Sequence, residues 1–259
     1  MVNPFERVSD ILRACGTPDG VLPPTALYNE GWMLRLVLDA YSHLGQPGLP
    51  LKPDAGARWH SEVLLPSRFL ARSRTDPLAE GWTHADAVIG HFSLRPGGRG
   101  DIQLAADAKQ FVVIEAKMFS PLSAGTRQAP TFNQAARNVA CMAQAIASAK
   151  VPLASLETVA FIVLAPESQL ALTEFTAIVN RESIGKVVAE RVASYHGTYD
   201  PWREEHFSPL CERIDILPIP WEAAIADIAS QQSSYGAQLL QFYDTCVRFN
   251  QPLSGGHLA

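Results

Sequence analysis

Hydrophobic positions along the chain recur first at helical spacing and then at strand spacing. Residues 29–44 leave only a narrow polar stripe on an otherwise apolar cylinder, which predicts a largely buried helix. Residues 58–72 follow the same period more weakly and predict a second helix, which contains Glu62. Two short strands separated by a glycine-rich turn are expected next. Their ranges are 85–94 and 101–104.

The most strand-like run is Phe111–Met118, where β-branched and aromatic residues lead into Glu115 and Lys117. After it, the pattern predicts a helix, a strand, a helix, an edge strand and two helices, over residues 130–149, 158–165, 169–195, 213–219, 221–230 and 233–249. This order predicts the α/β class, with a central mixed β-sheet flanked by helices. Residues 170–259 form a mainly helical C-terminal extension that we expect to pack on the core.

The composition narrows the class of protein. With 259 residues, 47% of them hydrophobic, the chain can bury a generous core, and we expect a single domain over residues 1–259. A net charge of −5 means that a polyanionic partner must meet a local patch. Four scattered cysteines, no signal-peptide pattern and no apolar run of about 18 residues predict a reduced, cytoplasmic protein without a membrane span.

Two charged residues in the most apolar predicted strand are the best candidates for chemistry. Glu115 and Lys117 are two positions apart, so they share one face of the strand, where ions need a partner or a metal. Hairpin pairing of the preceding predicted strand would bring Asp101 to the same face. Two carboxylates and a lysine suit Mg²⁺ together with a phosphate group. A surface salt bridge between Glu115 and Lys117 is the alternative interpretation.

The arrangement resembles the PD-(D/E)XK, or restriction-endonuclease-like, nuclease superfamily over roughly residues 29–165. That superfamily has a core of helix, three strands, helix and strand, and the matching segments here are Gly100-Asp101-Ile102 and Ile114-Glu115-Ala116-Lys117. The resemblance implies that Asp101 and Glu115 bind Mg²⁺ or Mn²⁺, with the Ala116 carbonyl as a third ligand, and that Lys117 is the catalytic lysine. One departure is that Gly100 stands where many members have proline.

The resemblance also implies a glutamate on the first core helix, here Glu30 or Glu62, and a glutamine on the helix after the third strand, here Gln134. Each has a simpler interpretation. Glu30 would favour the positive end of a helix dipole, and Gln134 is spaced from Thr131 as in a capping box. Asp86, on the first predicted strand, is a reserve ligand or a surface residue.

A local excess of basic residues surrounds the candidate site. Six basic and three acidic residues lie between positions 95 and 137. We expect nucleic-acid contacts from Arg99, Arg127, Arg137 and Asn138, or else an ordinary solvated helix face. A separate group of basic residues could flank them, namely Arg68, Arg72 and Arg74.

The sequence therefore predicts a metal-dependent nuclease, and the resemblance favours DNA over RNA. A non-catalytic nucleic-acid-binding or assembly module that keeps the fold is the alternative, and hydrolysis of a small phosphoester is a third hypothesis. A chain with one site would need a second copy, as in a homodimer, to cut both strands at once. The net charge also favours a partner subunit.

Overall fold

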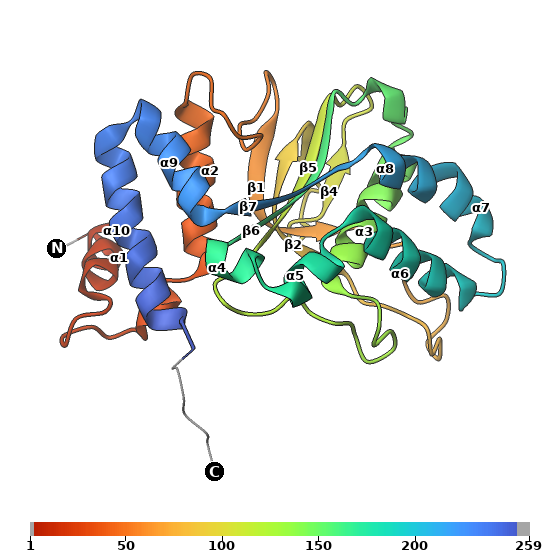
Figure 1. Cartoon of the computed structure of the whole chain (residues 1–259), viewed down its shortest axis with the longest axis horizontal. Helices are drawn as coiled ribbons and strands as arrows, with labels where there is room; N and C mark the ends of the chain where they lie inside the picture. The colour runs from red at the N-terminus through yellow and green to blue at the C-terminus, as the bar shows by residue number, and fades with distance from the viewer. Residues whose placement is uncertain (1–2, 253–259) are drawn as a thin grey trace, which may run out of the picture.

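The computed structural model describes residues 3–252 and has three layers, with a β-sheet between two groups of helices (Figure 1). The strands of this sheet are β1 (Arg58–Leu65), β2 (Thr83–Gly90), β5 (Gln110–Ala116), β6 (Thr158–Ala165) and β7 (Asp215–Pro220). Their order in the sheet is β1-β2-β5-β6-β7. The pairs β1–β2 and β2–β5 are antiparallel, whereas β5–β6 and β6–β7 are parallel, so the sheet is mixed.

A separate two-stranded ribbon leaves the sheet after β2. Its strands are β3 (Phe92–Leu94) and β4 (Ile102–Leu104). The start of β4 returns to the outer edge of β1, where the Leu64 N–H donates to the Gly100 carbonyl at 3.0 Å and Asp101 forms a bridge with Leu64. The ribbon is therefore an insertion between two strands that are adjacent in the sheet.

Helices from both ends of the chain cover one face of the sheet (left in Figure 1). They are α2 (Glu30–His43), α9 (Trp221–Gln231) and α10 (Ser233–Asn250). The first helix, α1 (Pro4–Ala14), has no buried residue and is not part of this layer. The middle of the chain supplies the helices of the other face and of the sheet's edge, namely α3 (Gln134–Ala149), α4 (Glu167–Leu170), α5 (Thr173–Ile178), α6 (Arg181–Ala193), α7 (Asp200–Trp202) and α8 (Ser208–Arg213). Short 3-10 turns occur at Pro24–Ala26 and Leu153–Ser155, and a π-helical turn at Arg203–Phe207.

The two faces of the sheet bury two separate apolar clusters. Val113 and Phe161 point into the cluster under α3 and α6, whereas Ile114 and Ile162 point into the cluster under α2, α9 and α10. Every residue of β5 is buried because helices cover both faces. A charged residue at the end of this strand is thus held where water is scarce.

The mixed sheet flanked by helices is confirmed, but two predicted elements are wrong. Residues 58–65 form β1 instead of a helix. Trp59 packs on one face of the sheet and Val63 on the other, because Glu62 between them has a φ of +55° and turns the strand over. The helix predicted over 169–195 is divided into α4, α5 and α6, and Asn180 caps the last of these by accepting from the Ser183 N–H.

The C-terminal part of the chain completes the sheet as well as one helical layer. Its strand β7 pairs in parallel with β6, from Ala160 opposite Asp215 to Ala165 opposite Pro220. Within residues 3–252, the helices lack the combination of length and apolar character that a bilayer-crossing segment has.

Candidate functional site

Glu115 is the centre of a buried polar cluster at the carboxyl end of β5. Its side chain is 1% exposed. Lys117 Nζ donates to its Oε1 atom at 2.6 Å, and Gln134 Nε2, from the first turn of α3, donates to the same atom at 2.5 Å. Asn138 Nδ2, one turn further along α3, donates to Oε2 at 3.0 Å. These donors fix the orientation of the carboxylate.

Asp86 brings a second carboxylate to this cluster from β2. The main-chain pairing of β2 with β5 ends at Ala87 and Ile114. Beyond it, Asp86 Oδ2 accepts from the Ala116 N–H at 2.7 Å, so a side chain takes the place of the next main-chain acceptor. The half-buried Asp86 is thereby fixed beside the strand that carries Glu115.

The charges of the cluster are unbalanced. Burial raises the pKa of Glu115 above its usual range, and the neighbouring Asp86 carboxylate raises it further, while Lys117 acts in the opposite direction. With both carboxylates ionised, the cluster of Asp86, Glu115 and Lys117 has a net charge of about −1, since two carboxylates face one ammonium. A cation would be stabilised here once both carboxylates are ionised.

The donor set fits a hard divalent cation with an incomplete protein shell. Mg²⁺ typically takes one or two carboxylates and fills its other positions with water and phosphate oxygens. Asp86 and Glu115 supply two carboxylates. Among the residues that the structure describes, there is no group of three or more His, Cys, Asp or Glu side chains placed to hold a metal. Most ligands would therefore be water or substrate.

The backbone around Lys117 is held at both of its polar groups. The Lys117 N–H donates to the Leu164 carbonyl at 2.8 Å, and its own carbonyl accepts from Trp221 Nε1 at 2.9 Å. Gln169 fixes the following loop through the Phe119 N–H and the Ser120 carbonyl. Sequence reasoning missed Trp221 and Gln169, since neither lies near the site in sequence and neither belongs to a local motif.

Gln134 lies in the site as the resemblance implies. Its Oε1 atom accepts from the Ser123 N–H at 3.1 Å while its Nε2 atom donates to Glu115. The capping-box alternative is wrong, because the residue that caps α3 is Asn133, whose side chain accepts from the Ala136 N–H.

The structure does not bring Asp101 to Glu115, and the predicted pairing of their strands is wrong. The neighbours of β5 are β2 and β6, whereas Asp101 lies outside β1. Strands are spaced by about 4.8 Å, so with β1 and β2 between them the two residues are about 14 Å apart. Asp101 Oδ2 lies 3.3 Å from Arg95 Nε, and Oδ1 accepts from the Arg99 N–H. Asp101 therefore stabilises the turn between β3 and β4.

The two glutamates considered as additional ligands have other surroundings. Glu30 begins α2 on the opposite face of the sheet, close enough to Cys246 of α10 to raise the pKa of that thiol in addition to the effect of burial. Glu62 belongs to β1 instead of a helix, and its exposed carboxylate lies 3.1 Å from Arg35 of α2. Neither has a contact with Glu115 among the described residues.

The residues expected to contact nucleic acid are divided between surface and core. Arg99 and Arg127 are exposed on loops. Arg137 is half-buried on α3, and its charge acts on Glu80. Asn138 is fully buried, which contradicts a surface role and leaves it as a partner of Glu115.

Asp86, a reserve ligand in the sequence-based prediction, is the second carboxylate that the structure places beside Glu115. A signal for it was present, since it lies within an apolar run long enough to form a central strand.

Scans against protein-family models, curated protein sequences and solved structures returned no significant match. Any assignment of function therefore depends on the geometry of the cluster.

Proposed function

We propose that the protein is a metal-dependent phosphodiesterase that cleaves nucleic acid, with Asp86, Glu115 and Lys117 as its reacting groups. The observation that carries this proposal is the placement of two carboxylates and a lysine at one point, where β2 and β5 separate. With the inserted ribbon β3–β4 left out, the chain follows the order helix, three strands, helix, strand that the PD-(D/E)XK superfamily has. The corresponding elements are α2, β1, β2, β5, α3 and β6. That resemblance supports the proposal, with Asp86 in the place first given to Asp101.

Each residue has a distinct part in the proposed reaction. Asp86 and Glu115 would hold Mg²⁺ or Mn²⁺, and the Ala116 carbonyl remains a candidate third ligand. The bound ion would make water a better nucleophile and stabilise negative charge on the phosphate. Lys117 would donate a hydrogen bond to the attacking water or to a phosphate oxygen. Gln134 and Asn138 would keep the Glu115 carboxylate in one orientation.

Cleavage assays on single variants test this assignment. Purified protein is incubated with supercoiled plasmid, single-stranded DNA and RNA, each with Mg²⁺, Mn²⁺ or chelator. We expect metal-dependent cutting that is lost in Asp86→Asn, Glu115→Gln and Lys117→Ala, with unchanged circular dichroism. Asp101→Asn is the matched control and should keep its activity. Loss of cutting in Asp101→Asn but not in Asp86→Asn would overturn the site, and no cutting by the wild type would overturn the proposal.

A non-catalytic binding or assembly module is the second candidate, and one observation favours it. Both oxygens of Glu115 already accept hydrogen bonds from side chains, as in a purely structural network. Thermal melting with and without Mg²⁺ separates the two functions. A metal site raises the melting temperature as metal is added, and Glu115→Gln removes the effect. A module without a metal site shows no shift.

DNA is the substrate that the resemblance favours over RNA. One site of this kind cuts one strand at a time, so simultaneous cutting of both strands would need a second copy of the chain. Product analysis on nicked and linear plasmid distinguishes the two modes.

A further inference from the structure

The segment between β1 and β2, residues 66–82, carries basic and aromatic side chains next to the candidate site; we call it the arginine loop. Its last residue, Trp82, directly precedes β2. Asp86 follows four positions later, which corresponds to about 13 Å along an extended strand. The end of this loop therefore lies close enough to the candidate site for one strand of nucleic acid to reach both.

The arginine loop has positive charge that nearby acids do not neutralise. Arg68, Arg72 and Arg74 are all exposed. Asp76 pairs with Arg72, at 3.0 Å from its Nε atom, and these hydrogen bonds lower the pKa of Asp76. Within residues 3–252, no carboxylate lies within ion-pair distance of Arg68 or Arg74. Two guanidinium groups are thus free to meet phosphates in a chain whose net charge is −5.

The other acid of the loop is directed inward. Glu80 is buried, and its Oε1 atom lies 3.2 Å from Nε of Arg191 on α6. Its charge is therefore turned away from the exposed surface. The face that the loop presents to solvent is basic.

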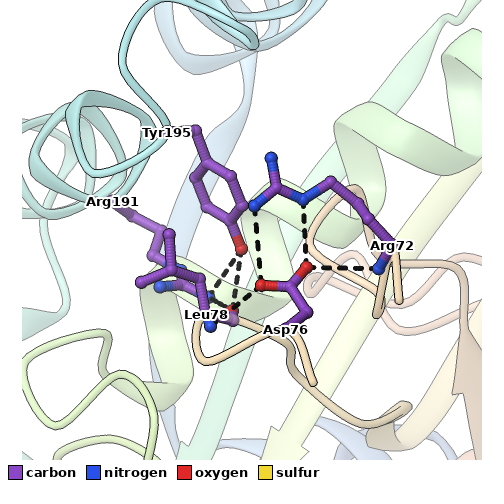
Figure 2. A network of polar contacts seen from close by, with 5 residues as sticks. All are labelled: Arg72, Asp76, Leu78, Arg191 and Tyr195. Atoms are coloured by element: carbon purple, nitrogen blue, oxygen red, sulfur yellow. Dashed lines mark hydrogen bonds and ion pairs between the residues drawn. The ribbon is translucent and has the colours of Figure 1, made fainter. Parts of the chain in front are cut away.

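Hydrogen bonds hold the arginine loop in one shape, as Figure 2 shows. Asp76 accepts from the Arg72 N–H at 3.2 Å and from the Leu78 N–H at 3.0 Å. The Leu78 carbonyl accepts from the Tyr195 hydroxyl at 2.8 Å and from the Arg191 guanidinium. A loop fixed before binding loses little entropy when a ligand arrives.

Two of the arginines in the loop stack on tyrosine rings of the protein. The Arg68 guanidinium lies 4.7 Å from the centre of the Tyr199 ring, and that of Arg72 lies 4.8 Å from the centre of the Tyr195 ring. These contacts restrict the two guanidinium groups while leaving both side chains exposed. Arg68 therefore presents its charge to solvent at a fixed position, whereas the charge of Arg72 is balanced by Asp76.

Trp82 adds an exposed aromatic surface to this basic loop. Its side chain is 50% exposed, although an indole of this size normally gains by burial. The Glu80 N–H donates to the Phe69 carbonyl at 2.9 Å and so joins the beginning of the loop to its end. Arg68 is one residue from Phe69 and Trp82 is two residues from Glu80, so this hydrogen bond brings their backbones near each other. An exposed indole near arginines that no acid neutralises is the combination that binds unpaired nucleotides, through base stacking and phosphate contacts.

We infer that the arginine loop binds single-stranded nucleic acid, with a base stacked on Trp82 and phosphates on Arg68 and Arg74. Stacking on an indole requires an unpaired base, because base pairs within a duplex are already stacked on both sides. The bound strand is the one that enters the site at Asp86 and Glu115, and in this respect the inference rests on the proposed function. A frayed end, a flap or an unpaired region is the corresponding substrate.

Binding is measured separately from cleavage by using Glu115→Gln with chelator present. The probe is a short fluorescent oligothymidylate, followed by anisotropy, and a duplex of equal length is the comparison. Trp82→Leu should weaken binding of the single strand by about 5- to 150-fold, the usual effect of losing one stacked base. Arg68→Ala and Arg74→Ala should each lower the slope of log affinity against log salt by about 0.7.

Two exposed residues elsewhere serve as controls. Trp32→Leu removes a partly exposed indole from α2, and Arg13→Ala removes an exposed arginine from α1. Both should leave affinity unchanged. Unchanged affinity in Trp82→Leu, or equal losses in Trp82→Leu and Trp32→Leu, would overturn the inference. So would tighter binding of the duplex than of the single strand.

The two proposals fail in different ways. Binding that depends on Trp82 in a wild-type protein that cuts nothing would retain the arginine loop and reject the nuclease. Cutting that depends on Asp86 while Trp82→Leu binds normally would retain the nuclease and reject the loop.

Discussion

The fold opposes ionisation of Glu80, the buried carboxyl at the base of the arginine loop. Arg191 is its ion-pair partner at 3.2 Å, and both side chains are at least 95% buried. Within the described residues, neither Oε1 of Glu80 nor Nε of Arg191 has a hydrogen bond of good geometry. Burial raises the pKa of Glu80 to about 7, although Arg191 and Arg137 act in the opposite direction. Cys141 is also close, and burial raises the pKa of its thiol to about 12.

This shift makes stability depend on pH in a definite direction. The folded protein binds the Glu80 proton more tightly than the unfolded chain, whose carboxyl has a pKa of 4.5. The associated stability is fully present below pH 4.5 and is lost as the pH rises through about 7. One pKa unit corresponds to about 1.4 kcal/mol, so the full loss is about 3 kcal/mol. Glu80→Gln has a similar shape and stays neutral, so it lacks this loss.

Urea unfolding of the wild type and of Glu80→Gln, at about pH 5 and about pH 8, measures the effect. The variant should gain about 2.5 kcal/mol relative to the wild type between the two conditions, because a small part of the loss has already occurred at about pH 5. Glu174→Gln, at an exposed position of α5, should show no such gain. If Glu80→Gln instead loses stability relative to the wild type as the pH rises, the ion pair with Arg191 outweighs burial and the reasoning is refuted.

Two further substitutions test how the fold positions the site. Gly90 has a φ of +156°, and a Cβ atom there would lie 2.3 Å from the Gln110 carbonyl oxygen, so Gly90→Ala should cost about 2 kcal/mol or more in urea unfolding. A neutral effect would mean that β2 and β5 can separate at this point without cost. Asn133→Ala removes the side-chain cap of α3 and should cost about 1 kcal/mol, observed as a lower melting temperature. Asn133→Ser should restore most of this loss, and a failure to do so would show that the cap is not the cause.

The elements that the sequence predicted best are those whose burial is uniform. The strand β6 was predicted over its full range, and β5 to within two residues, because both are continuous apolar runs covered on two faces. The strand β1 was mistaken for a helix, since the reversal at Glu62 breaks its alternation and scatters apolar residues over both faces. Local pattern does not reveal a reversal of this kind.

The candidate site was predicted in part for a similar reason. The spacing of Glu115 and Lys117 fixes their proximity along one strand, and Gln134 follows from the resemblance. Sequence order favours Asp101 over Asp86, because the nearest preceding strand is the simplest neighbour for β5. It cannot show that the ribbon β3–β4 is inserted between two paired strands. Trp221 is separated from Lys117 by 104 positions, so only the folded chain reveals their contact.

The helical layer that covers one face of the sheet has a consequence for synthesis of the protein. It combines α2, from the beginning of the chain, with α9 and α10, from its end. While the ribosome is still making residues 221–250, only α2 is present to cover the apolar face that contains Ile89, Ile114 and Ile162, and the part that α9 and α10 later cover stays exposed. During that interval the nascent chain depends on speed of elongation or on a chaperone to escape aggregation.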